Sequence, residues 1–220
     1  MNQAFYLEHL YPFQDQVLNL LSRVETGFYL TGGTALSRGY LNHRYSDDLD
    51  LFVNDNDAFT LWADRVMGAL AQSAHWGTQV LLREERYVRL SLAQADINLK
   101  IEMVNDVPSR VGEPWLHPVL GRVDTAENIL ANKATAILDR AASKDLADIW
   151  GLCYLKGLSL SDAITGAQGK AAGVFPVDLA RALVSATRAD WEAVRWVDPP
   201  DPEQFVAQLS ELGKSLIFSI

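Results

Sequence analysis

The chain has 220 residues, 49% of them hydrophobic and 21% charged, which is enough for one sizeable domain or for a catalytic domain with a helical appendage. Its formal net charge of -9 speaks against a protein that coats long stretches of DNA, because such binding needs a broad basic face. The single cysteine, Cys153, excludes an internal disulfide, and no apolar run reaches the roughly 18 residues that span a bilayer. We therefore expect no membrane partner and a cytoplasmic setting.

The first half of the chain alternates between helical and strand patterns. Residues 12–24 carry apolar side chains at helical spacing, and the apolar run 27–33 is typical of a buried strand that ends in a turn. Residues 47–53 alternate acids with aliphatic side chains, as a strand does, and 56–73 return to helical spacing. Three strand-like runs with short separators, which favour antiparallel hairpins, then follow at 78–84, 86–94 and 97–104.

From Thr125 the pattern is helical. A capped helix is predicted over 125–140, and Ser143 is predicted to cap the next helix. Two short stretches, 166–173 and 198–202, have linker composition but are too short to separate independent domains.

These patterns predict an α+β fold. A mixed β-sheet flanked by helices is expected in residues 1–124, and a C-terminal helical bundle that packs on it is expected in residues 125–220.

A glycine pair marks the end of the first strand. Gly32 and Gly33, followed by Thr34, allow a sharp turn whose backbone N–H groups can hold phosphate oxygens. Taken alone, such a pair is more often only a tight turn, and the G-K-[ST] sequence of a P-loop is absent.

Three acids are candidate metal ligands. Asp48 and Asp50 stand two apart on a predicted strand, so both carboxylates project from one face and suit Mg²⁺ or Mn²⁺. Glu102 lies on the polar face of a later strand and can join them if the two strands are neighbours. The alternative is that these are solvated acids on exposed strand faces, and the glycine turn upstream favours the metal site.

The helical half supplies positive charge. Lys133 and Arg140 are seven residues apart and share a helix face, and Lys133 is a candidate to bind a triphosphate. Lys144 and Asp145 open the next helix, where Asp145 can also do no more than complement the helix dipole.

Four sequence blocks in this order resemble the AbiE-type abortive-infection toxin family of nucleotidyltransferases. The blocks are G-G-T-A-L, R-x-S-x-D-L-D-L-F with Arg44 and Ser46, E-N-I-L-A-N-K, and R-x-x-x-K-D-L-A-D. The resemblance implies a nucleotidyltransferase-like fold, Mg²⁺ dependence and binding of a nucleoside triphosphate. It also implies a separate antitoxin as partner, and some relatives modify the ends of transfer RNA.

The resemblance assigns roles to individual residues. Asp48 and Asp50 would be the metal-binding pair, and Gly32, Gly33 and Thr34 would hold phosphate. Lys133, Lys144 and Asp145 would belong to the catalytic or substrate-binding set, which also includes Arg44, Ser46 and Arg140. Relatives often have aspartate where this chain has Glu102.

Two hypotheses about function follow. The first is Mg²⁺-dependent transfer of a nucleotidyl group from a nucleoside triphosphate to a hydroxyl acceptor on RNA or protein, by the toxin of a toxin–antitoxin pair. The second is a nucleotide-binding or partner-binding protein that keeps the site but catalyses weakly or not at all.

Overall fold

The computed structural model describes residues 3–140, 142–169 and 175–218, and the chain divides into two compact units. The first unit comprises Met1–Ala35, Ser46–Pro108 and Pro114–Asp124, and the second comprises Leu36–Tyr45, Ser109–Glu113 and Thr125–Ile220. The predicted helical region thus shares its unit with two short segments that precede it in the chain. The domain boundary after residue 124 stays a prediction.

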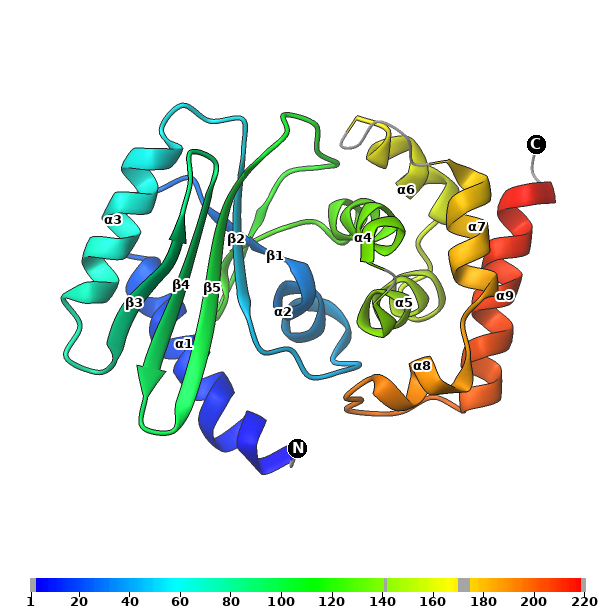
Figure 1. Cartoon of the computed structure of the whole chain (residues 1–220), viewed down its shortest axis with the longest axis horizontal. Coiled ribbons are helices and arrows are strands. Elements are labelled where there is room, and N and C mark those ends of the chain that lie inside the picture. Colours follow the sequence, from blue (N-terminus) through cyan, green and yellow to red (C-terminus); the bar gives the residue numbers. More distant parts are fainter. Residues whose placement is uncertain (1–2, 141, 170–174, 219–220) are drawn as a thin grey trace. The chain divides into compact units, whose positions relative to one another are not determined.

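Within the described residues, seven strands of the first unit form one mixed sheet (Figure 1). The strands are β1 (Tyr29–Thr31), β2 (Leu49–Asn54), β3 (Gly77–Arg83), β4 (Tyr87–Gln94), β5 (Ile97–Asp106), β6 (Trp115–His117) and β7 (Gly121–Val123). Their order is β3-β4-β5-β2-β1-β7-β6. Strands β3, β4 and β5 pair antiparallel, as the sequence predicts, whereas β2 and β5 pair in parallel. The predicted α+β fold with a mixed sheet flanked by helices is confirmed.

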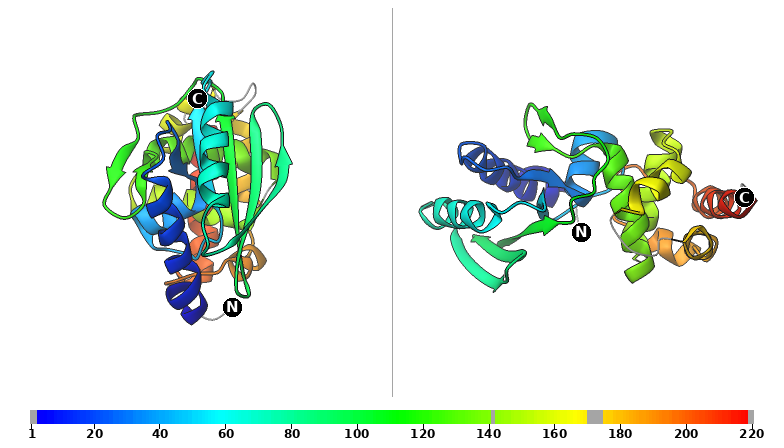
Figure 2. Two further views of the ribbon diagram at one scale, coloured as in Figure 1. Left: turned by 90° about the vertical axis from the view of Figure 1, so that its left-hand side faces the viewer. Right: turned by 90° about the horizontal axis from the view of Figure 1, so that it is seen from above.

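Two helices cover one face of this sheet (Figure 2), and the other face carries Asp50, Lys100 and Glu102, which alternate with buried residues along β2 and β5. The helical segments of this part of the chain are η1 (Phe5–Leu10, a π-helix), α1 (Tyr11–Leu21), α2 (Gly32–Leu36) and α3 (Phe59–Ala71). Helices α1 and α3 lie on the covered face. Leu49, Leu51 and Val53 of β2 are buried on that face, because alternate strand residues point to the same side. Asp50, between them, points to the opposite side.

The second unit is helical in its described residues. Its segments are η2 (Ser37–Leu41) and η3 (Gly151–Leu155), both π-helical, with α4 (Ala126–Arg140), α5 (Ser143–Trp150), α6 (Leu160–Ala167), α7 (Pro176–Val184), α8 (Arg188–Ala193) and α9 (Pro202–Phe218). Helices α7 and α9 lie side by side (Figure 1). The ring of Trp150 lies 5.9 Å from that of Trp196 and 5.8 Å from that of Phe205, so an aromatic cluster forms part of this core.

Some local predictions differ from the structure. The predicted cap residue Ser143 is the first residue of α5, and its hydroxyl donates to Oδ1 of Asp190 at 2.9 Å instead of capping the helix. Ala142 occupies the cap position without a side-chain hydrogen bond. In the predicted linker 166–173, the first two residues belong to α6 and residues 170–173 lie outside the described residues.

Candidate active site

The turn between β1 and α2 is built around Gly32. Its φ of +69° lies in the left-handed region, which glycine adopts without the steric cost that a Cβ brings. A Cβ at this position would lie 2.2 Å from Oδ2 of Asp50, so the Asp50 carboxylate packs directly against the backbone of the turn. The structure thus brings the predicted glycine turn and one predicted acid together.

Thr34 and Ser46 fix the segment that leads into β2. The buried Thr34 hydroxyl donates to the carbonyl oxygen of Asp48 at 2.5 Å and lies 3.1 Å from the hydroxyl of Ser46. Gln14 of α1 donates to the carbonyl oxygen of Asp47 at 2.9 Å. These bonds hold the backbone of Asp48 in place, because each joins it or a close neighbour to another part of the unit.

Asp50 and Glu102 lie opposite each other on neighbouring strands. β2 and β5 pair in parallel with Asp50 beside Glu102, and residues paired across a sheet point to the same face. The same row continues to Thr31 on β1 and to Arg89 on β4. Asp48 stands two residues before Asp50 and one before β2 begins. The sequence leaves open whether the two strands are neighbours, and the register shows that they are.

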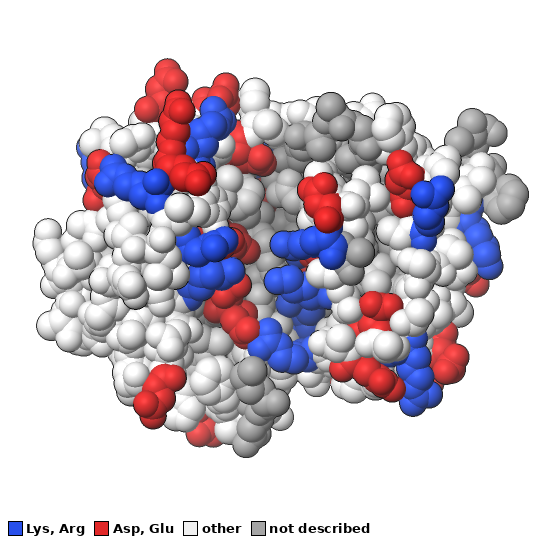
Figure 3. Space-filling view, in the orientation of Figure 1, with Lys and Arg blue, Asp and Glu red and all other residues white. Residues whose placement is uncertain are grey.

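Basic side chains lie among these carboxylates, and Figure 3 shows basic and acidic side chains close together near the middle of this view. Lys100 Nζ lies 2.9 Å from Asp48 Oδ2 and 3.4 Å from Glu102 Oε1. Arg89 Nε and the Tyr87 hydroxyl donate to the same Glu102 oxygen at 2.9 and 2.7 Å. Burial alone would raise the pKa of Glu102, but these donors together hold that pKa below its usual value. Glu102 is therefore an ionised carboxylate at neutral pH.

The second unit contains a buried ion network between α4 and α5. Lys133 on α4 is 6% exposed, and its Nζ lies 2.7 Å from Asp145 Oδ1 and 2.7 Å from Asp148 Oδ2. Arg140 binds Asp145 with two donors, Nε to Oδ2 at 2.7 Å and Nη2 to Oδ1 at 2.9 Å. Burial would raise the pKa of Asp145, but Arg140 and Lys133 hold it below its usual value. The shared helix face predicted for Lys133 and Arg140 is confirmed by this common partner.

Asp148 is the centre of the network and is not among the residues that the sequence predicts for the site. Arg44 binds it with two donors, Nε to Oδ1 at 2.6 Å and Nη2 to Oδ2 at 2.7 Å. Nε2 of His43 lies 2.9 Å from Oδ1. Burial would raise the pKa of Asp148, but attraction to Arg44 and Lys133 holds it well below its usual value. Asp148 therefore stays charged although it is fully buried.

The loop that carries His43 and Arg44 is held within the same unit. Arg44 forms an isolated antiparallel bridge with Trp196, and the backbone N–H of Val197 donates to the carbonyl oxygen of His43 at 2.9 Å. The carbonyl oxygen of Arg44 also accepts a bond from the Ser37 hydroxyl. The guanidinium of Arg44 is thus positioned by its backbone as well as by Asp148.

A match to a protein-family model shows which family the chain belongs to. The family described as nucleotidyl transferase AbiEii toxin, type IV toxin–antitoxin system, matches residues 18–198. The chain belongs to this family. It is therefore a nucleotidyltransferase, and the family and enzyme class predicted from the sequence blocks are confirmed. No curated protein matches the chain.

Solved structures share the fold of this AbiEii family member. JHP933 from Helicobacter pylori has 22% sequence identity and a TM-score of 0.62, with 100% of this chain and 94% of that chain covered. MenT4, a nucleotidyltransferase toxin from Mycobacterium tuberculosis, has 19% identity and a TM-score of 0.59, with 94% of this chain and 82% of that chain covered. In the described part of the chain, no helix is long and apolar enough to cross a membrane.

The donor set of the AbiEii chain fits a cation held by two carboxylates. Among the residues that the structure describes, no three carboxylate, imidazole or thiol side chains gather as a metal-binding group. Mg²⁺ is commonly bound through one or two carboxylates, with phosphate oxygens and water completing the octahedron. Asp48 and Asp50 are the candidate pair, and their role as cation ligands stays a prediction. Glu102 shares one oxygen among three donors, and its role as the third acid stays a prediction.

Other residues predicted to bind substrate have different surroundings. Arg44 and Ser46 are 4% and 8% exposed and bond within the chain, whereas Lys144 is exposed. Arg140 is half-exposed, so part of its guanidinium is accessible to solvent. The substrate contacts proposed for these four residues stay predictions.

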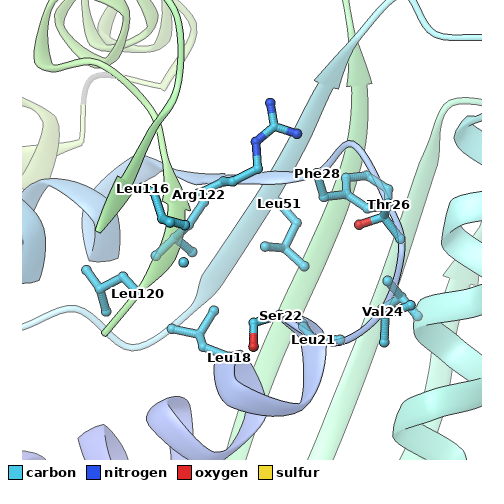
Figure 4. A pocket seen from close by; sticks show the side chains of 13 residues that line it. Leu18, Leu21, Ser22, Val24, Thr26, Phe28, Leu51, Leu116, Leu120 and Arg122 are labelled. Atoms are coloured by element: carbon cyan, nitrogen blue, oxygen red, sulfur yellow. The ribbon is translucent and has the colours of Figure 1, made fainter. Parts of the chain in front are cut away.

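A cavity of about 260 Å³ lies on the covered, apolar face of the sheet (Figure 4). Its lining includes Leu18 and Leu21 of α1, Leu51 of β2, Leu120 and Arg122. Among the described residues, its lining contains none of the predicted site residues. Asp50, which alternates with Leu49 and Leu51 along β2, points to the opposite face of the sheet.

Proposed function

We propose that the protein transfers a nucleotidyl group from a nucleoside triphosphate to a hydroxyl acceptor on RNA or protein, with Mg²⁺ or Mn²⁺ as cofactor. Membership of the AbiEii family supports the reaction class. The observation that carries the proposal is the packing of Asp50 against the Gly32 turn, in one row with Glu102 and beside Asp48. That arrangement supports cation binding next to a turn of phosphate-binding type.

Each chemical role that the proposed reaction requires has a candidate among the chain's own residues. Asp48 and Asp50 hold the cation, which when bound would stabilise the charge that develops on the transferred phosphoryl group. Glu102 is the proposed third acid. The backbone N–H groups of the turn hold phosphate oxygens. The turn residues are Gly32, Gly33 and Thr34.

The ion network of the second unit contains Lys133 and Asp145, for which we propose further roles. Two carboxylates fix the Lys133 ammonium, so its position does not depend on a long flexible side chain. We propose that Lys133 and Asp145 act in the reaction. The residues proposed to contact substrate are Arg44, Ser46, Arg140 and Lys144.

Transfer of labelled nucleotide tests this function. The protein is incubated with each of the four α-labelled triphosphates, Mg²⁺ and either total RNA or cell protein. We expect label on one acceptor class, and Asp50→Asn to reduce transfer by about 100-fold or more, because it removes a cation ligand. Asp55→Asn is the matched control, since Asp55 is exposed and pairs with Arg86 instead. Transfer that survives Asp50→Asn at the wild-type rate would contradict the metal assignment.

One observation favours a second candidate function, a nucleotide-binding or partner-binding protein without transfer. The proposed third acid, Glu102, already accepts bonds from Tyr87 and Arg89 and faces Lys100. Calorimetry with the triphosphates measures binding, and the labelling experiment measures transfer. Binding without label transfer to any acceptor supports the binding protein over the transferase. The family's toxin–antitoxin classification implies an antitoxin protein as a partner.

A further inference from the structure

Lys100 forms ion pairs with two of the proposed metal ligands in the first unit. Its backbone is fixed in the middle of β5 between the fully buried Leu99 and Ile101. Its ammonium bridges two carboxylates, 2.9 Å from Asp48 Oδ2 and 3.4 Å from Glu102 Oε1. The bridge thus occupies one oxygen of a residue that the proposed function assigns to a divalent cation.

The bridge is electrostatically favourable but exchangeable. The Lys100 ammonium faces a carboxylate oxygen of Asp48 and another of Glu102, and both contacts are attractive. The side chain of Lys100 is 37% exposed, and that of Asp48 is 32% exposed. Exposed pairs of this kind are weak, and a lysine has a flexible stem that lets the head move without moving the strand.

We propose that Lys100 is an exchangeable counter-ion of the carboxylate pair, which holds Asp48 when no divalent cation is bound and must release it for the cation to bind. This inference rests on the proposed function, since it takes Asp48 and Asp50 as the cation ligands. Lys100 then acts as a positioning residue that weakens cation binding in the absence of nucleotide. An incoming triphosphate offers the released ammonium new anionic partners, so cation and nucleotide binding become coupled.

Calorimetric titration with Mn²⁺ at low ionic strength, without nucleotide, tests the competition. We expect Lys100→Gln to bind Mn²⁺ about tenfold more tightly than the wild type, because the competing ammonium and its repulsion of the metal are both removed. Lys100→Arg keeps the charge and should bind like the wild type. Arg86→Gln is the matched control, because it removes the same charge from a pair with Asp55 and should leave Mn²⁺ affinity unchanged.

The direction of the effect separates competition from a structural role. Loss of a structural contact would weaken Mn²⁺ binding, whereas loss of a competitor strengthens it. Equal or weaker binding by a folded Lys100→Gln protein, or equal tightening by Lys100→Arg, overturns the proposal. Lys100→Met is the second variant if the glutamine protein does not fold, with circular dichroism as the check.

A further comparison distinguishes failure of this inference from failure of the proposed function. Asp50→Asn should abolish the heat of Mn²⁺ binding that the wild type gives. If that heat persists in Asp50→Asn, the metal assignment of the proposed function fails, and the inference fails with it. If the heat is lost in Asp50→Asn but unchanged in Lys100→Gln, only the inference fails.

Discussion

Replacing Gly32 by alanine tests the packing of the glycine turn against Asp50. Two costs follow from the structure. A residue with a Cβ at φ +69° costs about 1–2 kcal/mol relative to glycine. The added Cβ would lie 2.2 Å from Asp50 Oδ2, and relieving such an overlap typically costs about 1–3 kcal/mol. We therefore expect Gly32→Ala to lower the free energy of unfolding by about 2–5 kcal/mol.

The same substitution should impair the proposed chemistry. The Asp50 carboxylate must retreat by about 1 Å to make room, and a misplacement of that size costs on the order of 100-fold in rate. Urea denaturation measures the stability, and Mn²⁺ calorimetry and nucleotide transfer measure the site. Gly68→Ala on α3 is the control, because a Cβ there meets nothing within 4 Å. In a helix interior that change is expected to stabilise by about 0.5–1 kcal/mol.

The outcome that refutes this reasoning is specific. A Gly32→Ala protein that unfolds at the wild-type urea concentration and binds Mn²⁺ with wild-type affinity would show that the turn tolerates a Cβ beside Asp50. A loss of stability as large in Gly68→Ala would show that the effect is not particular to the turn.

The ion network of the second unit leads to two further predictions. Asp148→Asn leaves the buried cations with too little negative charge, so it should lower the free energy of unfolding in urea by about 3–5 kcal/mol. Asp139→Asn, on the exposed side of α4, is the control and should change that free energy by less than about 0.5 kcal/mol. Equal losses of stability in the two variants would contradict a stabilising role of Asp148 in the network. Acid should destabilise the folded protein in two pH ranges. Burial lowers the pKa of His43 below 6.5, so the imidazole takes up a proton in the unfolded chain before it does so in the folded protein, and stability falls below about pH 6.5. The pKa of Asp148 lies well below 3.8, so its contribution is complete above that pH and lost below it. Urea melts from about pH 8 to about pH 3 measure both, and an unchanged slope near pH 6 in His43→Gln would contradict the first pH range.

The fold was predictable where a pattern is local. Hairpin-linked strands 78–84, 86–94 and 97–104 follow from alternation and short separators, and they correspond to β3, β4 and β5. The parallel pairing of β2 with β5 follows from no local pattern, because the two strands are joined through α3, β3 and β4. β6 and β7 have three residues each, which is too short for a periodicity to register. The prediction that Ser143 caps α5 was wrong, because its hydroxyl donates to Asp190, which is distant in the sequence.

The site was predictable in its residue types more than in its contacts. The spacing of Asp48 and Asp50 predicts a shared face, but the bridge from Lys100 depends on the β2–β5 register. Asp148 could have been found, because it stands three residues after Asp145 and so on the same side of α5. Its flanking residues, Ala147 and Ile149, are apolar, which indicates a buried acid that needs a cation. Which cation it binds requires the tertiary fold.

Charge distribution limits how an anionic substrate reaches this protein. The net charge of -9 repels RNA at long range. Many of the basic groups near the candidate residues face carboxylates of their own unit, as Lys100, Lys133, Arg44, Arg89 and Arg140 do. Binding along a duplex draws its affinity from many lysine and arginine contacts to phosphate, so groups that are already paired contribute little to it. Under the proposed function, a divalent cation that arrives with a triphosphate would instead bring positive charge to Asp48 and Asp50. Because added salt screens the long-range repulsion, substrate binding of this kind should be less sensitive to salt than binding along a duplex.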